Sequence, residues 1–85
     1  MSNATETERK TTQDAAAALI GRTIVAVRYM SAQEAGEMCW FHRAMIVELD
    51  DGTLLFASAD EEMNDAGVLW VERGDHEVCL GRLPA

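Results

Sequence analysis

The chain has 85 residues, of which 48% are hydrophobic and 26% are charged, a composition typical of a single small globular domain. It carries 7 Lys and Arg residues against 15 Asp and Glu residues, which gives a formal net charge of −8 at pH 7. Proteins that bind nucleic acid or an anionic membrane need a basic surface, and this composition supplies a poor one. We therefore expect neither nucleic acid nor a membrane as a partner.

The N-terminal part of the chain divides into a polar segment and a helix. Residues 1–10 have mixed charge and no apolar periodicity, which predicts a flexible tail, so the single domain is expected over residues 11–85. A helix is predicted over Thr11–Gly21, because it begins at a residue suited to capping and ends at a glycine. Leu19 and Ile20 are its only large apolar residues, so this helix is expected to cover another element.

Five further segments have the alternation and the β-branched or aromatic composition of strands. They span Arg22–Met30, His42–Asp50, Thr53–Ala59, Val68–Arg73 and Glu77–Leu83. Asp51-Gly52 and Gly74-Asp75 predict tight turns between consecutive strands. Ser31 and Glu34 match the S-x-x-E capping box, which predicts a short helix over residues 32–37.

This order of elements predicts a mainly β fold, a small five-stranded antiparallel barrel of the SH3-like (Sm-like) kind with an N-terminal helix. Closure would remove the exposed edges that a flat sheet leaves. The alternative is an α+β arrangement, an open antiparallel sheet with one helix on a face.

Leu54-Leu55-Phe56 and Val68–Val71 are apolar on both strand faces. One face would still need cover, so a homo-oligomer is expected.

An acidic turn lies between two of the predicted strands. Its candidate ligand-binding residues are Asp60, Glu62, Asn64 and Asp65. Oxygen-rich loops bind Ca²⁺ or Mg²⁺. However, Asp65 and Val71 occupy the sixth and twelfth positions, where a calcium-binding EF-hand loop needs Gly and Glu. We expect no metal and no other cofactor. The turn is either a solvated connection whose side chains cap backbone N–H groups or a binding loop.

A second cluster is formed by Cys39, Trp40, Phe41 and His42. Cys39 and His42 could form a thiolate–imidazolium pair, but no third residue that would orient them is evident, so no catalytic residue is predicted. Trp40 or Phe41 is expected to anchor the short helix, with Cys39 as an apolar filler, while Trp40 and His42 are also candidates for lining a binding groove. Cys79 is predicted to be a buried thiol, and its pairing with Cys39 stays open.

The compartment is expected to be the cytoplasm. The polar N-terminus has no signal-peptide core, and no apolar run approaches the roughly 20 residues of a membrane span. The two cysteines are too few for a disulfide framework and lack the spacing of a zinc site. Free thiols in a reducing compartment are the natural interpretation.

Several short stretches match a recurring pattern. They are Gly21-Arg22-Thr23-Ile24, Val27-Arg28-Tyr29-Met30, Glu34, Trp40, Leu49-Asp50-Asp51-Gly52-Thr53 and Asp60-Glu61-Glu62-Met63-Asn64-Asp65-Ala66-Gly67. On these residues, the segment from Leu19 to Trp70 resembles a family of small, uncharacterised bacterial proteins. The acidic turn of that family reads Asp-x-Glu-Gly-Asn-x-x-Gly, and a glycine precedes its tryptophan. Met63 and Cys39 stand at these two glycine positions. The resemblance implies a compact domain similar to an Sm-like or SH3-like barrel and implies no activity.

Taken together, these features predict a non-enzymatic, homo-oligomeric binding or interaction module for a small molecule or a protein. One alternative is a small enzyme that uses Cys39 with His42, or carboxylates of the acidic turn. Another is an Sm-like RNA binder, which rests on architecture alone and which the net charge of −8 disfavours.

Overall fold

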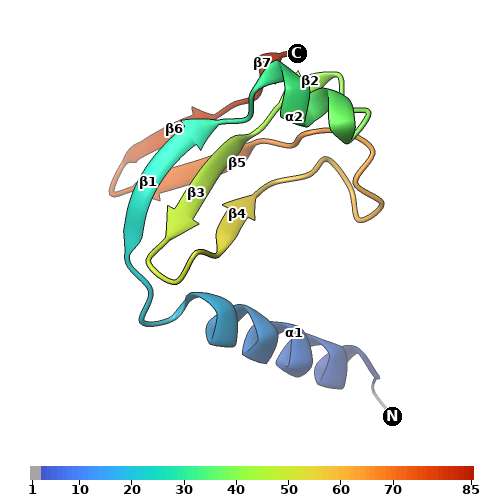
Figure 1. Cartoon of the computed structure of the whole chain (residues 1–85). Helices are drawn as coiled ribbons and strands as arrows, with labels where there is room; N and C mark the ends of the chain where they lie inside the picture. Colours follow the sequence, from blue (N-terminus) through green and yellow to red (C-terminus); the bar gives the residue numbers. More distant parts are fainter. Residues whose placement is uncertain (1–2) are drawn as a thin grey trace.

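The computed structural model describes residues 3–85. Within this range the chain forms two helices and seven strands (Figure 1). They are α1 (Asn3–Leu19), β1 (Ile24–Tyr29), α2 (Ala32–Glu37), β2 (His42–Arg43), β3 (Met45–Leu49), β4 (Leu54–Phe56), β5 (Leu69–Arg73), β6 (His76–Leu80) and β7 (Leu83–Pro84). The mainly β character, the antiparallel pairing and the N-terminal helix agree with the prediction.

The largest sheet has three antiparallel strands in the order β1-β3-β4. Val27, Val47 and Leu55 are aligned across it, so their side chains share one face. The predicted Asp51-Gly52 turn joins β3 to β4. Gly52 has a φ of 87°, and its N–H donates a hydrogen bond of 3.0 Å to the Leu49 carbonyl. The left-handed backbone explains why glycine occupies this position.

Two smaller sheets complete the fold. β5 pairs with β6, and Arg73 lies opposite His76, so Gly74-Asp75 forms the predicted two-residue turn. β2 pairs with β7, with His42 opposite Pro84. The C-terminus therefore returns to the start of the second predicted strand.

The prediction of a closed five-stranded barrel was wrong, because none of the sheets described over residues 3–85 closes on itself. A barrel needs a continuous hydrogen-bonded ladder. Here β4 has three residues, and a single bridge between Ser58 and Ala66 follows it before β5 begins. The second predicted strand is also interrupted at Ala44, whose carbonyl accepts a hydrogen bond from Met30 N–H. The open arrangement is compatible with the α+β alternative.

The first helix starts earlier than predicted, at Asn3 rather than Thr11. Residues 3–10 of the predicted tail are thus helical, while Met1 and Ser2 lie outside the described residues. Ala, Glu, Lys and Arg favour helix, and Lys10 pairs with Asp14 one turn away at 3.1 Å. The helix ends before Gly21, whose φ is 83°. In Figure 1, α1 lies apart from the sheets.

The core lies between α2 and the three-stranded sheet. It consists of Met30, Ala35, Trp40, Ala44, Ile46 and Ala66, with Met38 at its margin. The capping box of α2 is confirmed: Glu34 N–H donates to Ser31 Oγ at 3.1 Å, and Ser31 N–H donates to Glu34 Oε1 at 2.8 Å. Arg28 on β1 donates two hydrogen bonds to the same carboxylate, at 2.9 and 3.1 Å. These contacts hold α2 against β1 and lower the pKa of Glu34 to about 2, the Arg28 hydrogen bond being the largest cause.

Within residues 3–85, neither helix has the length and apolar character needed to cross a lipid bilayer.

Candidate functional site

Trp40 connects α2 to the acidic turn. Its backbone N–H donates to the Ala35 carbonyl at 2.9 Å, where α2 ends, and Cys39 before it has a left-handed φ of 61°. This reversal directs the indole into the core, where Nε1–H donates to the Met63 carbonyl at 2.8 Å. Trp40 is therefore the anchor that the sequence predicted, whereas the neighbouring Phe41 is 77% exposed.

Asp65 lies at the base of the acidic turn and joins three segments of the chain. Its Oδ1 accepts hydrogen bonds from the backbone N–H groups of Phe41, His42 and Ala66, at 3.0, 3.1 and 2.8 Å. Its Oδ2 lies 2.7 Å from His42 Nδ1 and 3.6 Å from an Arg82 guanidinium nitrogen. One carboxylate thus fastens the turn to β2 and to the C-terminal segment.

The surroundings of Asp65 keep it ionised. Burial acts to raise the pKa of Asp65, but hydrogen bonds from His42, Ala66 and Phe41 outweigh it and lower the pKa to about 2. An ionised carboxylate can only accept hydrogen bonds, so we infer that His42 Nδ1 carries the proton in this pair. The other ring nitrogen, Nε2, has no hydrogen-bond partner within residues 3–85.

The tip of the acidic turn is organised by Asp60. Its Oδ1 accepts from the backbone N–H groups of Glu62 and Asn64, at 3.0 and 3.2 Å, and its Oδ2 accepts from Asn64 Nδ2 at 3.0 Å. The side-chain hydrogen bond from Asn64 is the largest of the effects that lower the pKa of Asp60. Met63, which lies between Asp60 and Asn64 in the sequence, has a left-handed φ of 59°. The tip side chains are exposed, and the Asp60 carboxylate is used to hold the turn.

The structure therefore divides the predicted site residues into two groups. Trp40, His42 and Asp65 come together at the base of the turn, where His42 and Asp65 form a direct pair. Asp60, Glu62 and Asn64 lie at the exposed tip and bond with one another. In the part of the chain that the structure describes, no group of three or more His, Cys, Asp or Glu side chains is arranged to hold a metal ion.

The His42–Asp65 pair has the geometry of a base and its orienting carboxylate. Nucleophilic catalysis by such a pair also needs a nucleophile within hydrogen-bond reach of the second ring nitrogen, whereas general-base catalysis needs a substrate or a water molecule there. Cys39 is exposed and makes no hydrogen bond to His42 in the described chain. The arrangement as it stands positions backbone segments, and chemistry at this pair would require a reactive group from elsewhere.

Sequence reasoning missed Arg82. Its guanidinium donates to the Ala66 carbonyl at 2.7 Å and lies beside Asp65. Its place in the sequence falls within the fifth predicted strand, and 16 residues separate it from the carbonyl it contacts. No local pattern could have indicated this pairing. Tyr29, whose hydroxyl donates to the Gly81 carbonyl at 2.6 Å, fixes the residue before Arg82.

The prediction that Cys79 is buried was wrong, and Cys39 is not a buried filler either, because both cysteines are exposed and both are free. Cys79 lies directly opposite Trp70 in the β5–β6 hairpin, on the face that also carries Glu72 and Glu77. An apolar neighbourhood in sequence, Val78 and Leu80, suggested burial, but successive strand residues point to opposite faces.

An apolar groove lies between the three-stranded sheet and the β5–β6 hairpin. It has a volume of about 370 Å³. Its lining consists of Leu19, Met45, Val47, Leu55, Phe56, Ala57, Gly67, Leu69 and Leu80. We call this feature the apolar groove. Its lining includes members of the apolar runs that the sequence marked as lacking cover.

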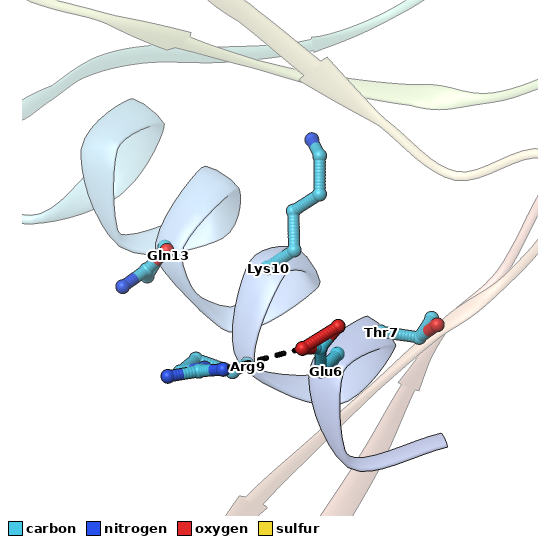
Figure 2. Close-up of a pocket in the computed structure, with 5 residues that line it drawn as sticks. All are labelled: Glu6, Thr7, Arg9, Lys10 and Gln13. Carbon is cyan, nitrogen blue, oxygen red and sulfur yellow. Dashed lines mark ion pairs between the residues drawn. The ribbon is translucent and has the colours of Figure 1, made fainter. Parts of the chain in front are cut away.

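A second hollow runs along α1 and is lined by Glu6, Thr7, Arg9, Lys10 and Gln13 (Figure 2). Its volume is about 460 Å³. All five side chains come from a single helix and are exposed, and the Glu6–Arg9 contact is a long 4.0 Å. A surface of one helix with solvated side chains lacks the convergent groups of a binding site.

Comparison of the chain with protein-family models, curated proteins and solved structures found no match.

Proposed function

We propose that this protein is a non-enzymatic interaction module that associates with itself and holds a protein or small-molecule partner. The observation that carries the proposal is the apolar groove, together with the exposed apolar side chains on the strands around it. Soluble monomers rarely leave a continuous apolar surface of this kind open, whereas interaction surfaces commonly have one.

Two of the candidate site residues hold the fold of the acidic turn. Asp65 and Trp40 are committed to hydrogen bonds that fix the base of the turn. In this proposal they act as positioning residues. The partner meets the exposed tip, where Asp60, Glu62 and Asn64 present oxygen atoms to solvent. The alternatives of a small enzyme and of an Sm-like RNA binder have no comparable observation in their favour.

The mass of the protein in solution tests the self-association. Sedimentation velocity and light scattering would be measured over about a hundredfold range of concentration, because association depends on mass action. The expected result is a species with an integral multiple of the chain mass, which dissociates on dilution or persists throughout. A monomer at every concentration would show that the self-association is wrong.

A further inference from the structure

We propose that the apolar groove is the surface through which two copies of this chain join, each presenting the same face across a twofold axis. The inference rests on the proposed self-association and adds which face makes the contact and what occupies the groove. In a twofold dimer each copy contributes the same patch, so a single self-complementary surface is sufficient.

The register of the strands defines the two walls of this surface. On the sheet, Val27, Val47 and Leu55 are directly opposite one another and share a face. On the hairpin, Leu69 is opposite Leu80 and Val71 is opposite Val78, and these four also share a face. Val47, Leu55, Leu69 and Leu80 line the groove, so Val27, Val71 and Val78 extend its walls toward solvent.

The apolar residues of the two walls are only partly covered within one chain. Val27 is 59% exposed, Val78 is 52% exposed and Leu55 is 38% exposed. In addition, no residue that lines the groove is ionisable. The surface therefore has the apolar, uncharged character of the centre of a permanent interface.

The dimensions of the chain leave room for such an interface. Its accessible surface is 6394 Å², whereas a compact monomer of this size exposes about 5,000 Å². Its radius of gyration is 14.8 Å, against roughly 12 Å for a compact domain of this length. Part of the excess belongs to α1, which stands apart. A standard interface takes about 800 Å² from each partner, and the exposed apolar side chains of the sheet and the hairpin are the surface available for it.

Charge indicates that the groove, rather than the outer face of the hairpin, meets the second copy. Each chain carries a net charge of −8, so two copies repel one another, and the repulsion is greatest where a contact brings carboxylates together. The outer face of the hairpin carries the exposed Trp70, but Glu72 and Glu77 lie opposite each other beside it. Two copies joined there would bring four carboxylates together, whereas the groove brings together none.

Substitutions on the two walls of the groove and on the outer face of the hairpin test the inference. Leu55→Glu and Val78→Glu each place a carboxylate in the proposed contact. Trp70→Glu is the matched control, because it changes an apolar residue that is 65% exposed on the opposite face. We expect the wild type and Trp70→Glu to sediment as dimers, and both groove variants to dissociate with a loss of affinity of about a hundredfold or more. Far-ultraviolet circular dichroism verifies that each variant is folded.

Two other results would overturn the inference. If the groove variants remain dimeric, the contact lies elsewhere, although the self-association in the proposed function still holds. If the wild type is monomeric, both the groove contact and the proposed self-association are wrong. If the wild type is a monomer that binds a hydrophobic dye, and Leu55→Glu abolishes that binding, the groove belongs to an apolar small molecule.

A milder variant covers the case in which a glutamate disturbs folding. The double substitution Val27→Thr and Val78→Thr keeps the β-branching and the approximate shape of both residues and replaces one methyl group of each with a hydroxyl. It is expected to weaken the dimer by about tenfold or more while the circular dichroism stays unchanged. An unchanged dimer affinity in this folded variant would count against the groove.

Discussion

Gly67 shows how one residue of the acidic turn is constrained by its neighbours rather than by its own backbone angle. A Cβ at this position would lie 2.6 Å from the Ser58 carbonyl oxygen and 2.7 Å from the Ser58 carbonyl carbon. The Gly67 N–H also donates to the Ala57 carbonyl at 2.8 Å. Backbone approaches backbone here, so no flexible side chain can move aside. Glycine is the only residue that fits without a shift of the chain.

We expect Gly67→Ala to lower the free energy of unfolding by about 2 kcal/mol, because the clash must be relieved by moving the Ser58 segment. Gly36→Ala is the matched control. Gly36 lies in α2, and a Cβ added there would meet nothing within 4 Å, so alanine should raise the free energy of unfolding by about 0.5–1 kcal/mol. Urea denaturation of both variants measures these changes. Equal stability of the two would contradict the close approach.

Among residues 3–85, two residues other than glycine adopt left-handed backbone angles, namely Cys39 and Met63. Cys39 directly precedes Trp40, and Met63 supplies the carbonyl that accepts the hydrogen bond of the Trp40 indole. Composition and periodicity give no sign of a left-handed backbone at a cysteine or a methionine, since these side chains disfavour it. The two reversals could therefore not be predicted from these patterns.

At the level of elements, sequence reasoning succeeded where the signal is local. The capping box of Ser31 and Glu34 predicted α2 over Ala32–Glu37, and Asp51-Gly52 and Gly74-Asp75 predicted the two hairpin turns. Each of these depends on residues within a few positions of one another. The contacts of Trp40 and His42 with the acidic turn join residues more than 20 positions apart. The sequence could therefore suggest these residues as candidates but could not predict that they are in contact.

The strand breaks show the same limit. Alternation continues through His42–Asp50, yet the strand is divided at Ala44 because β2 pairs with the distant β7 and β3 pairs with β1. An apolar alternation with a period of two specifies which residues share a face of a strand, but it does not specify which strand pairs with it. The barrel prediction failed for this reason, since closure depends on which edges meet.

The position of α1 leads to a prediction about its removal. From Thr5 to Leu19 its side chains are exposed, except for a half-buried Ala16. A chain that starts at Leu19 keeps the residue that reaches the groove. We expect it to lose the helical circular dichroism of α1 but to change the free energy of unfolding by less than about 1 kcal/mol, since exposed residues contribute little. Loss of the near-ultraviolet signal of the packed aromatic residues would contradict this.

For the whole molecule, the response to acid follows from its carboxylates. Glu34 and Asp65 have pKa values of about 2, against ordinary values of 4.5 and 3.8. The unfolded chain therefore binds protons more readily, and the stability that these groups provide is complete above about pH 5 and lost as the pH falls toward 2. Asp51 and Asp60 have lowered pKa values as well, which acts in the same direction.

We expect the free energy of unfolding to fall steadily between about pH 5 and pH 2. Asp65→Asn should be less stable at neutral pH, because the amide is a weaker acceptor for three backbone N–H groups. It should also show a shallower decline on acidification. Denaturant titrations at a series of pH values measure both effects. A variant with the same slope as the wild type would show that Asp65 does not set the acid response.

The two tryptophans occupy opposite environments within one small molecule. Trp40 is 4% exposed and hydrogen-bonded to the Met63 carbonyl, whereas Trp70 stands 65% exposed on the outer face of the hairpin. As a consequence, we expect the intrinsic fluorescence of the protein to contain two separable components. The indole in the core emits at shorter wavelength and is shielded from aqueous quenchers, and the exposed indole emits at longer wavelength and is quenched. The folded state thus carries an internal and an external optical reporter without any label.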